Sequence, residues 1–248
     1  MSGSGERAAR EGKGRFATTH WSVVLKARSS DDGESRDALA VLCQAYWSPV
    51  FLYIKQRGHD AEAARDLTQG FFAALLEKKG IAEARQERGR FRTFLLTAVK
   101  NFLANEHDFR TAQKRGGGQA PISIEADEWN ATMAIVEPAT HLTPEVLYEK
   151  RWTLALLDGA LRELEKDAER SGGVDKFRKL SGYLGNDEHP PYRALALDLD
   201  MTETGVRVAL HRLRQRYGAK VREQVAQTLD DPAKIEDELR YLISLMRS

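Results

Sequence analysis

The sequence predicts an all-α fold with two helical domains, and three observations lead to this expectation. Apolar side chains recur every three or four residues through most of the chain, which is the period of an α-helix. Proline is scarce, with 7 residues in 248, and no stretch of any length shows the alternation typical of a β-strand. Hydrophobic residues make up 42% of the chain, which is enough for packed cores.

The N-terminal half predicts a tail and one helical domain. Residues 1–17 are rich in glycine, serine and charge, so we expect a disordered tail that is not a secretory signal. The domain spans residues 18–115, with helices expected at residues 21–27, 35–56, 60–79 and 90–115. Residues 31–35 are expected to form a loop, Pro49 to kink the second helix, and Asp60 to cap the third.

The C-terminal half predicts a linker, a second domain and a final helix. Residues 116–144 contain three glycines in a row, three prolines, several carboxylates and no Lys or Arg, which indicates an acidic linker. The second domain spans residues 145–228, with helices expected from about residue 143 and at residues 174–184, 191–199 and 203–229. Residues 229–248 form an amphipathic C-terminal helix, which we expect to fold back on the second domain or to bind an inhibitory protein.

Composition and spacing argue against several other classes of protein. A single cysteine, Cys43, allows no internal disulfide and fits a cytoplasmic protein, and no apolar run reaches the roughly 20 residues of a membrane span. The dipeptides His59-Asp60 and His107-Asp108 lack further ligands at metal spacing. Because no nucleophile stands with a base, we expect no catalytic residue, no metal and no cofactor.

Residues 191–218 show the spacing of a helix-turn-helix. Leu195, Ala196 and Leu199 share one face of the first helix, and Thr202 is a natural N-cap for the second. Apolar residues then recur at intervals of four, three and four: Val206, Leu210, Leu213 and Tyr217. Most such turns have Gly where this chain has Asp200, because the backbone is left-handed there; Asp tolerates that conformation better than most residues.

The outer face of the second helix is basic and suits the major groove of DNA. Six basic residues and one acidic residue lie between positions 203 and 222. The side chains expected nearest the bases and phosphates are Thr204, Arg207, Val208, His211, Arg212 and Lys220. The alternative is a helical hairpin with an ordinary solvated basic face; the agreement of register, turn, cap and charge favours DNA binding.

With HRLRQRY at residues 211–217, this segment resembles region four of bacterial sigma factors, and most closely the extracytoplasmic-function group, which keeps only regions two and four. Two N-terminal segments resemble region two. Residues 61–75 carry Asp66, Leu67, Gln69 and Phe72 in its Asp-Leu-x-Gln-x-x-Phe pattern. Residues 89–103 carry an aromatic-Leu pair followed by a basic-Asn pair, Lys100-Asn101. The chain is longer than a minimal member of the group, which indicates a divergent branch.

The resemblance implies two partners, core RNA polymerase and promoter DNA. Asp66 and Gln69 would bind the polymerase, the C-terminal helix-turn-helix would read the upstream promoter element, and the acidic linker would enter the RNA channel. A further set of residues would contact the melted promoter element: Lys100, Asn101, Asn105, Arg110, Lys114 and Arg115. The base-capture loop departs from the family pattern, since Asn105 and Asp108 stand where an acidic residue and an Arg are usual.

Two other functions stay open at this point. One is a helix-turn-helix regulator that binds DNA without being a polymerase subunit, for which an exposed Asp66 and Gln69 would have no purpose. The other is a helical phosphohydrolase, which metal content would distinguish. Phe91, Phe94 and Phe102 are expected in the core, whereas Phe109 is the aromatic residue expected to be exposed for stacking on an unpaired base.

Overall fold

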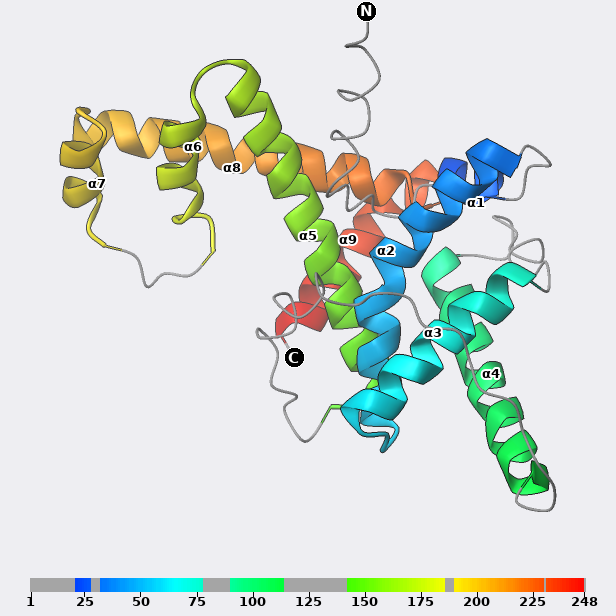
Figure 1. The fold of residues 1–248 in the computed structure, drawn as a ribbon. Helices are drawn as coiled ribbons and strands as arrows, with labels where there is room; N and C mark the ends of the chain where they lie inside the picture. Colours follow the sequence, from blue (N-terminus) through cyan, green and yellow to red (C-terminus); the bar gives the residue numbers. More distant parts are fainter. Residues whose placement is uncertain are drawn as a thin grey trace, which may run out of the picture. The chain divides into compact units, whose positions relative to one another are not determined.

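The described part of the chain is helical. The structure, a computed structural model, describes residues 21–27, 32–77, 90–113, 142–185, 190–229 and 231–247 (Figure 1). Within these ranges the regular elements are α-helices and one 3₁₀ turn, and none is a β-strand. The predicted all-α class is therefore confirmed for the described residues. The predicted tail and nearly all of the acidic linker lie outside them.

The chain forms two compact units, and their boundary falls inside a helix. Unit 1 comprises residues 1–155 and 227–248, and unit 2 comprises residues 156–226. Helix α5 (Pro144–Arg170) contributes its first part to unit 1 and its remainder to unit 2. The sequence placed the whole of this helix in the C-terminal domain, so the observed division differs from the expected one.

The first part of α5 belongs to unit 1 because its aromatic residues pack among the N-terminal helices. The hydroxyl of Tyr148, which is buried, donates a hydrogen bond of 3.0 Å to the carbonyl of Arg92. The indole Nε1 of Trp152 donates to the hydroxyl of Tyr46 at 3.1 Å. Burying two large aromatic side chains stabilises this packing by about 2–3 kcal/mol each, and their polar atoms are satisfied as well.

The described part of unit 1 contains four helices before α5. They are α1 (Trp21–Ala27), α2 (Asp32–Gln56), α3 (Ala61–Glu77) and α4 (Phe91–Gln113). The expected loop at residues 31–35 is wrong from Asp32 onward, because α2 begins there.

Helix α2 forms the apolar centre of unit 1. Its segment Ala38–Gln56 is long and apolar enough to cross a membrane by length and composition alone, but 53% of that segment is buried inside the protein. Val50, Tyr53 and Ile54 are fully buried, as expected for the core helix of a globular unit. Pro49 lies inside this helix, and the helix continues past it to Gln56.

The predicted N-cap of α3 is confirmed, and α5 also has an N-cap. The Asp60 side chain accepts a hydrogen bond of 2.8 Å from the amide of Ala63, and Thr143 accepts one of 3.3 Å from the amide of Val146 at the start of α5. Before α3, Gly58 has a φ of 95°, a conformation that costs glycine little. These local contacts set the bounds of α3 and α5.

The C-terminal helix belongs to unit 1. After a 3₁₀ turn (Pro232–Lys234), α9 (Ile235–Arg247) buries Glu238 beside Arg92 of α4. Glu238 pairs with Arg92 and also with Arg90. The expectation that this helix folds back on the helix-turn-helix domain is therefore wrong, because its buried carboxylate finds its charged partners at the beginning of α4.

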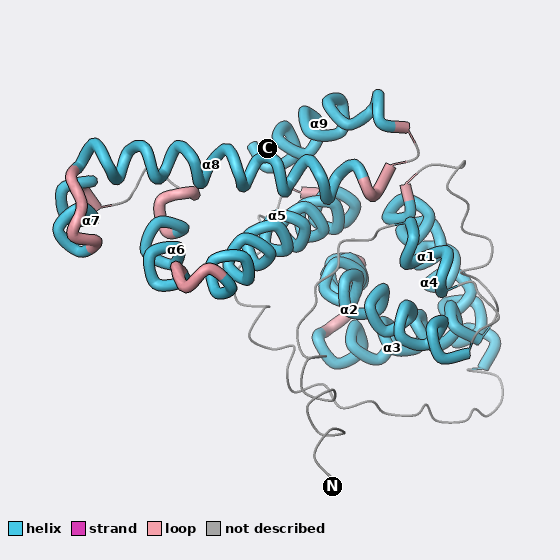
Figure 2. The backbone as a smooth tube through the Cα atoms, turned by 90° about the horizontal axis from the view of Figure 1, so that it is seen from above, coloured by secondary structure: helices cyan, strands magenta, loops and turns pink. Residues whose placement is uncertain are grey.

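Unit 2 is built on the second part of α5, followed by α6 (Val174–Ser181), α7 (Tyr192–Asp198) and α8 (Glu203–Ala226). Helices α6 and α7 pack against α8, as Figure 2 shows. The core draws on all four helices and on the turn after α6: Leu164, Ala168, Phe177, Leu180, Tyr183, Leu195, Ala196, Val206, Leu210 and Leu213. This core holds α8 by one face and leaves its other face to solvent.

Candidate nucleic-acid interface

The turn between α7 and α8 has the backbone that the sequence predicted. Asp200 has a φ of 51°, and it is the single non-glycine residue with positive φ among the described residues. The amide of Met201 then donates to the carbonyl of Ala196 at 2.8 Å, which closes the end of α7. The amide of Gly205 donates to the Thr202 hydroxyl at 3.0 Å, so Thr202 caps α8.

Two small residues allow α7 and α8 to approach each other closely. Ala196 is buried in the core of unit 2. A Cβ atom on Gly205 would lie 3.2 Å from the Thr202 hydroxyl and 3.3 Å from the end of the Met201 side chain, tighter than ordinary van der Waals contact. A larger residue at position 205 would therefore push on the turn that sets the angle between the two helices.

Helix α8 divides into an apolar and a polar face, as predicted. Val206, Leu210 and Leu213 are buried. The predicted contact residues on the opposite face are all exposed: Thr204, Arg207, Val208, His211 and Arg212. Val208 is 45% exposed, so its methyl groups lie at the surface of this face.

Lys220, the remaining predicted contact residue of α8, is half-buried and has carboxylate partners that the sequence did not indicate. Its ammonium group lies 3.0 Å from Glu223 and 3.5 Å from Glu163 of α5. The hydrogen bond to Glu223 and the nearby carboxylates raise the pKa of Lys220. Both pairs are partly exposed and contribute little, so a phosphate could still replace a carboxylate at Lys220, as at other exposed pairs.

The structure brings two residues to this interface that the sequence analysis did not single out. The guanidinium carbon of Arg207 lies 5.2 Å from the centre of the Tyr192 ring, at the beginning of α7. Arg214, two turns after Arg207, donates to the carbonyl of Tyr183 at 3.0 Å. The sequence signal that could have identified Tyr192 is its place directly after Pro190 and Pro191, where the chain enters α7.

Comparisons with known proteins give no family for this chain. No protein-family model, curated protein or solved structure matches it.

Four of the six residues in the second predicted DNA-binding set lie on α4, and the structure describes the side chains of three of them. Asn101 and Asn105 are exposed. Lys100 forms an ion pair of 2.9 Å with Glu145 at the start of α5, and the hydroxyl of Tyr53 donates to the same carboxylate at 3.5 Å. The hydrogen bond from Lys100 is the main cause that lowers the pKa of Glu145.

The rest of that set lies where side chains are not described. Arg110 belongs to α4, but its side chain is not described, and Lys114 and Arg115 lie outside the described residues. The side chain of Phe109 is not described either, so its expected exposure stays a prediction. The expected core aromatics are confirmed in part, since Phe91 is buried and Phe94 and Phe102 are half-buried. Phe102 packs edge to face on Phe71, with 5.7 Å between ring centres.

The predicted polymerase-binding pair lies on α3. Asp66 is exposed and Gln69 is half-buried. The opposite face carries the predicted apolar stripe, all of it buried: Ala64, Leu67, Phe71 and Leu75. Phe72 is also buried, where its ring stacks on Trp47 at 5.8 Å between centres. The Asp66 carboxylate is thus available to a partner protein.

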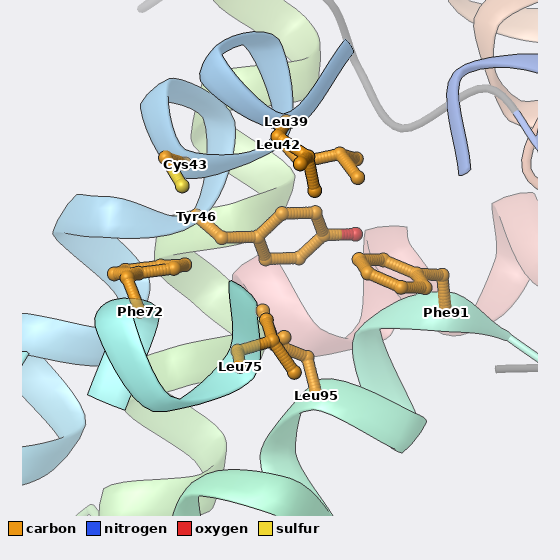
Figure 3. Close-up of a pocket in the computed structure, with 8 residues that line it drawn as sticks. All are labelled: Leu39, Leu42, Cys43, Tyr46, Phe72, Leu75, Phe91 and Leu95. Atoms are coloured by element: carbon orange, nitrogen blue, oxygen red, sulfur yellow. The ribbon is translucent and has the colours of Figure 1, made fainter. Parts of the chain in front are cut away.

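Unit 1 also contains a small apolar cavity (Figure 3), which has room for about one water molecule. Tyr46 lies between Phe72 and Phe91 at its centre, and Cys43 faces it from α2. Burial raises the pKa of the Cys43 thiol to about 11, which makes it a poor nucleophile. Among the described residues, no group of three or more His, Cys, Asp or Glu side chains could hold a metal ion.

Proposed function

We propose that this protein is a sigma factor that directs core RNA polymerase to a class of promoters. The observation that carries the proposal is the helix-turn-helix of unit 2, in which a left-handed Asp200 and a Thr202 cap present a basic, exposed face on α8. The resemblance of residues 61–75 and 89–103 to region two supports a second, polymerase-binding part of the same chain. The activity is binding rather than catalysis.

In the proposed mechanism each surface has a separate task. Arg207, Val208 and Arg212 read base edges of the upstream element in the major groove. Asp66 and Gln69 on α3 hold the polymerase. The exposed amides of Asn101 and Asn105 on α4 contact the melted element, and Lys100 exchanges its carboxylate partner Glu145 for a phosphate.

The exchange at Lys100 is energetically feasible because its pair with Glu145 is exposed to water. The Lys100 side chain is 44% exposed and that of Glu145 is 36% exposed. Exposed pairs contribute about 0–1 kcal/mol, so a phosphate can replace the carboxylate at little cost. The same argument does not apply to buried pairs such as Arg92–Glu238, which we assign to stability alone.

The proposal is tested by run-off transcription with purified core polymerase, on a library of genomic fragments. The full chain should yield transcripts from a subset of fragments that the polymerase alone does not transcribe. Asp66→Ala combined with Gln69→Ala should abolish co-purification with the polymerase and leave the helix content unchanged, since alanine favours helices. Glu62→Ala, an exposed acidic residue on the same helix, is the matched control.

The result also decides between the proposal and a regulator that binds DNA without polymerase. A chain that binds specific duplexes, but neither co-purifies with polymerase nor starts transcription, would establish the regulator. A chain that does none of these would leave the basic face of α8 as an ordinary solvated surface.

A further inference from the structure

We infer that Tyr192 is a positioning residue, which holds Arg207 for the recognition of one base. The inference rests on the proposed function, since it assumes that α8 reads duplex DNA. The guanidinium of Arg207 lies over the face of the Tyr192 ring, 5.2 Å from its centre. A ring face attracts a cation, so this contact limits the directions in which a long, exposed side chain can point.

Tyr192 is itself held in place from two sides. Pro191 precedes it with φ −54° and ψ 143°, which fixes the direction in which the chain enters α7. Its ring packs on that of Tyr183, which is buried, with 6.0 Å between ring centres. Arg214 of α8 in turn donates to the carbonyl of Tyr183. The Tyr192 ring is therefore anchored to the core of unit 2 and stays partly exposed.

This arrangement leaves Arg207 able to bind DNA. The guanidinium has five N–H donors in one plane, and an attraction to a ring face occupies none of them with a hydrogen-bond acceptor. Two of them can donate to O6 and N7 of a guanine, the commonest specific contact of an arginine in the major groove. An arginine held in one orientation loses less conformational entropy when it makes these bonds, and it binds wrongly placed acceptors less well.

The chain offers an internal comparison on the same helix. Arg212 is exposed on the predicted reading face. Among the described residues, no aromatic ring is paired with its guanidinium in the way that Tyr192 is with Arg207. If the ring contact confers discrimination, the base position read by Arg207 should be read strictly, and a change at Tyr192 should affect that position and not the one read by Arg212.

The experiment separates the electrostatics of the ring from its packing. The full chain, with and without core polymerase, is first used to select from a library of duplexes with a randomised segment. Arg207→Ala identifies the base position that this arginine reads, as the one whose preference disappears. Tyr192→Phe is then compared with chains that carry ring-fluorinated phenylalanines at position 192, which keep the ring's shape but withdraw electron density from its face.

We expect Tyr192→Phe to retain the preference at the Arg207 position and successive fluorination to reduce it, by about two- to fivefold in the affinity ratio between preferred and substituted duplexes. Preferences at other positions and the thermal unfolding midpoint should not change. In Arg207→Ala chains the fluorination should have no effect. The role of Tyr192 would be overturned if fluorination left the affinity ratio unchanged, or if it lowered the affinity for all duplexes equally. Either result would leave intact the proposal that α8 reads DNA. A wild-type chain that selects no sequence would overturn both.

Discussion

Replacing Glu238 by glutamine removes one charge from the most deeply buried ion pair that the structure describes. The Glu238 side chain is 0% exposed, and its Oε1 accepts a hydrogen bond of 2.5 Å from Nη2 of Arg92, which is 1% exposed. Arg92 also donates from Nε to Glu149 at 2.7 Å and lies 4.2 Å from the centre of the Trp152 ring. Helices α4, α5 and α9 therefore meet at one guanidinium.

The size of the effect follows from this burial. Burial lowers the pKa of Arg92, but Glu149 and Glu238 raise it by more, so the arginine stays charged. Removing one partner of a buried pair costs about 3–5 kcal/mol, because the remaining charge is left without compensation. Glu149 remains beside Arg92, and glutamine still accepts a hydrogen bond. We therefore expect the lower end of this range, a loss of about 3 kcal/mol in the free energy of unfolding.

Urea denaturation of the full chain, followed by circular dichroism, measures this effect. At a slope of roughly 2 kcal/mol per molar urea, the unfolding midpoint of unit 1 should fall by about 1.5 M in Glu238→Gln. Asp237→Asn is the matched control one residue earlier, where the partner is Arg240 and the pair is 73–77% exposed. That change should cost less than about 1 kcal/mol. Equal midpoints for the two variants would refute the role assigned to the buried pair.

Two further predictions concern a turn and an ion pair. Asp200→Gly should stabilise unit 2 by about 0.5–1 kcal/mol, because glycine adopts the φ of 51° without strain, whereas Asp200→Val should destabilise it. Thermal unfolding of the full chain measures both effects. A glycine variant that is less stable than the natural chain would contradict the argument. Glu145→Gln should remove the stability that depends on the lowered pKa of Glu145. The difference in the free energy of unfolding between this variant and the natural chain should be present above the unfolded-state pKa near 4.5. It should disappear as the pH falls through the lower folded-state pKa of Glu145. A stability difference that persists in acid would show that the pair with Lys100 is not its cause.

Much of the fold could be predicted because it depends on contacts between residues close in the sequence. The caps at Asp60, Thr143 and Thr202 and the left-handed turn at Asp200 each involve atoms a few residues apart. The buried stripes of α3 and α8 follow from helical periodicity alone. For the same reason the exposed residues of the proposed reading face, such as Arg207, could be named before the structure was known.

What the sequence could not decide involves charged and aromatic groups far apart in the chain. Arg92 and Glu238 are separated by 146 positions, and nothing in either local pattern indicates that they meet in the core, so the packing of α9 on unit 1 was missed. The ion pairs of Lys220 with Glu163 and of Lys100 with Glu145, and the ring of Tyr192 under Arg207, were missed for the same reason. Periodicity determines which face of a helix is buried, whereas the partner of a particular charge depends on how the helices pack, and only the tertiary structure decides that.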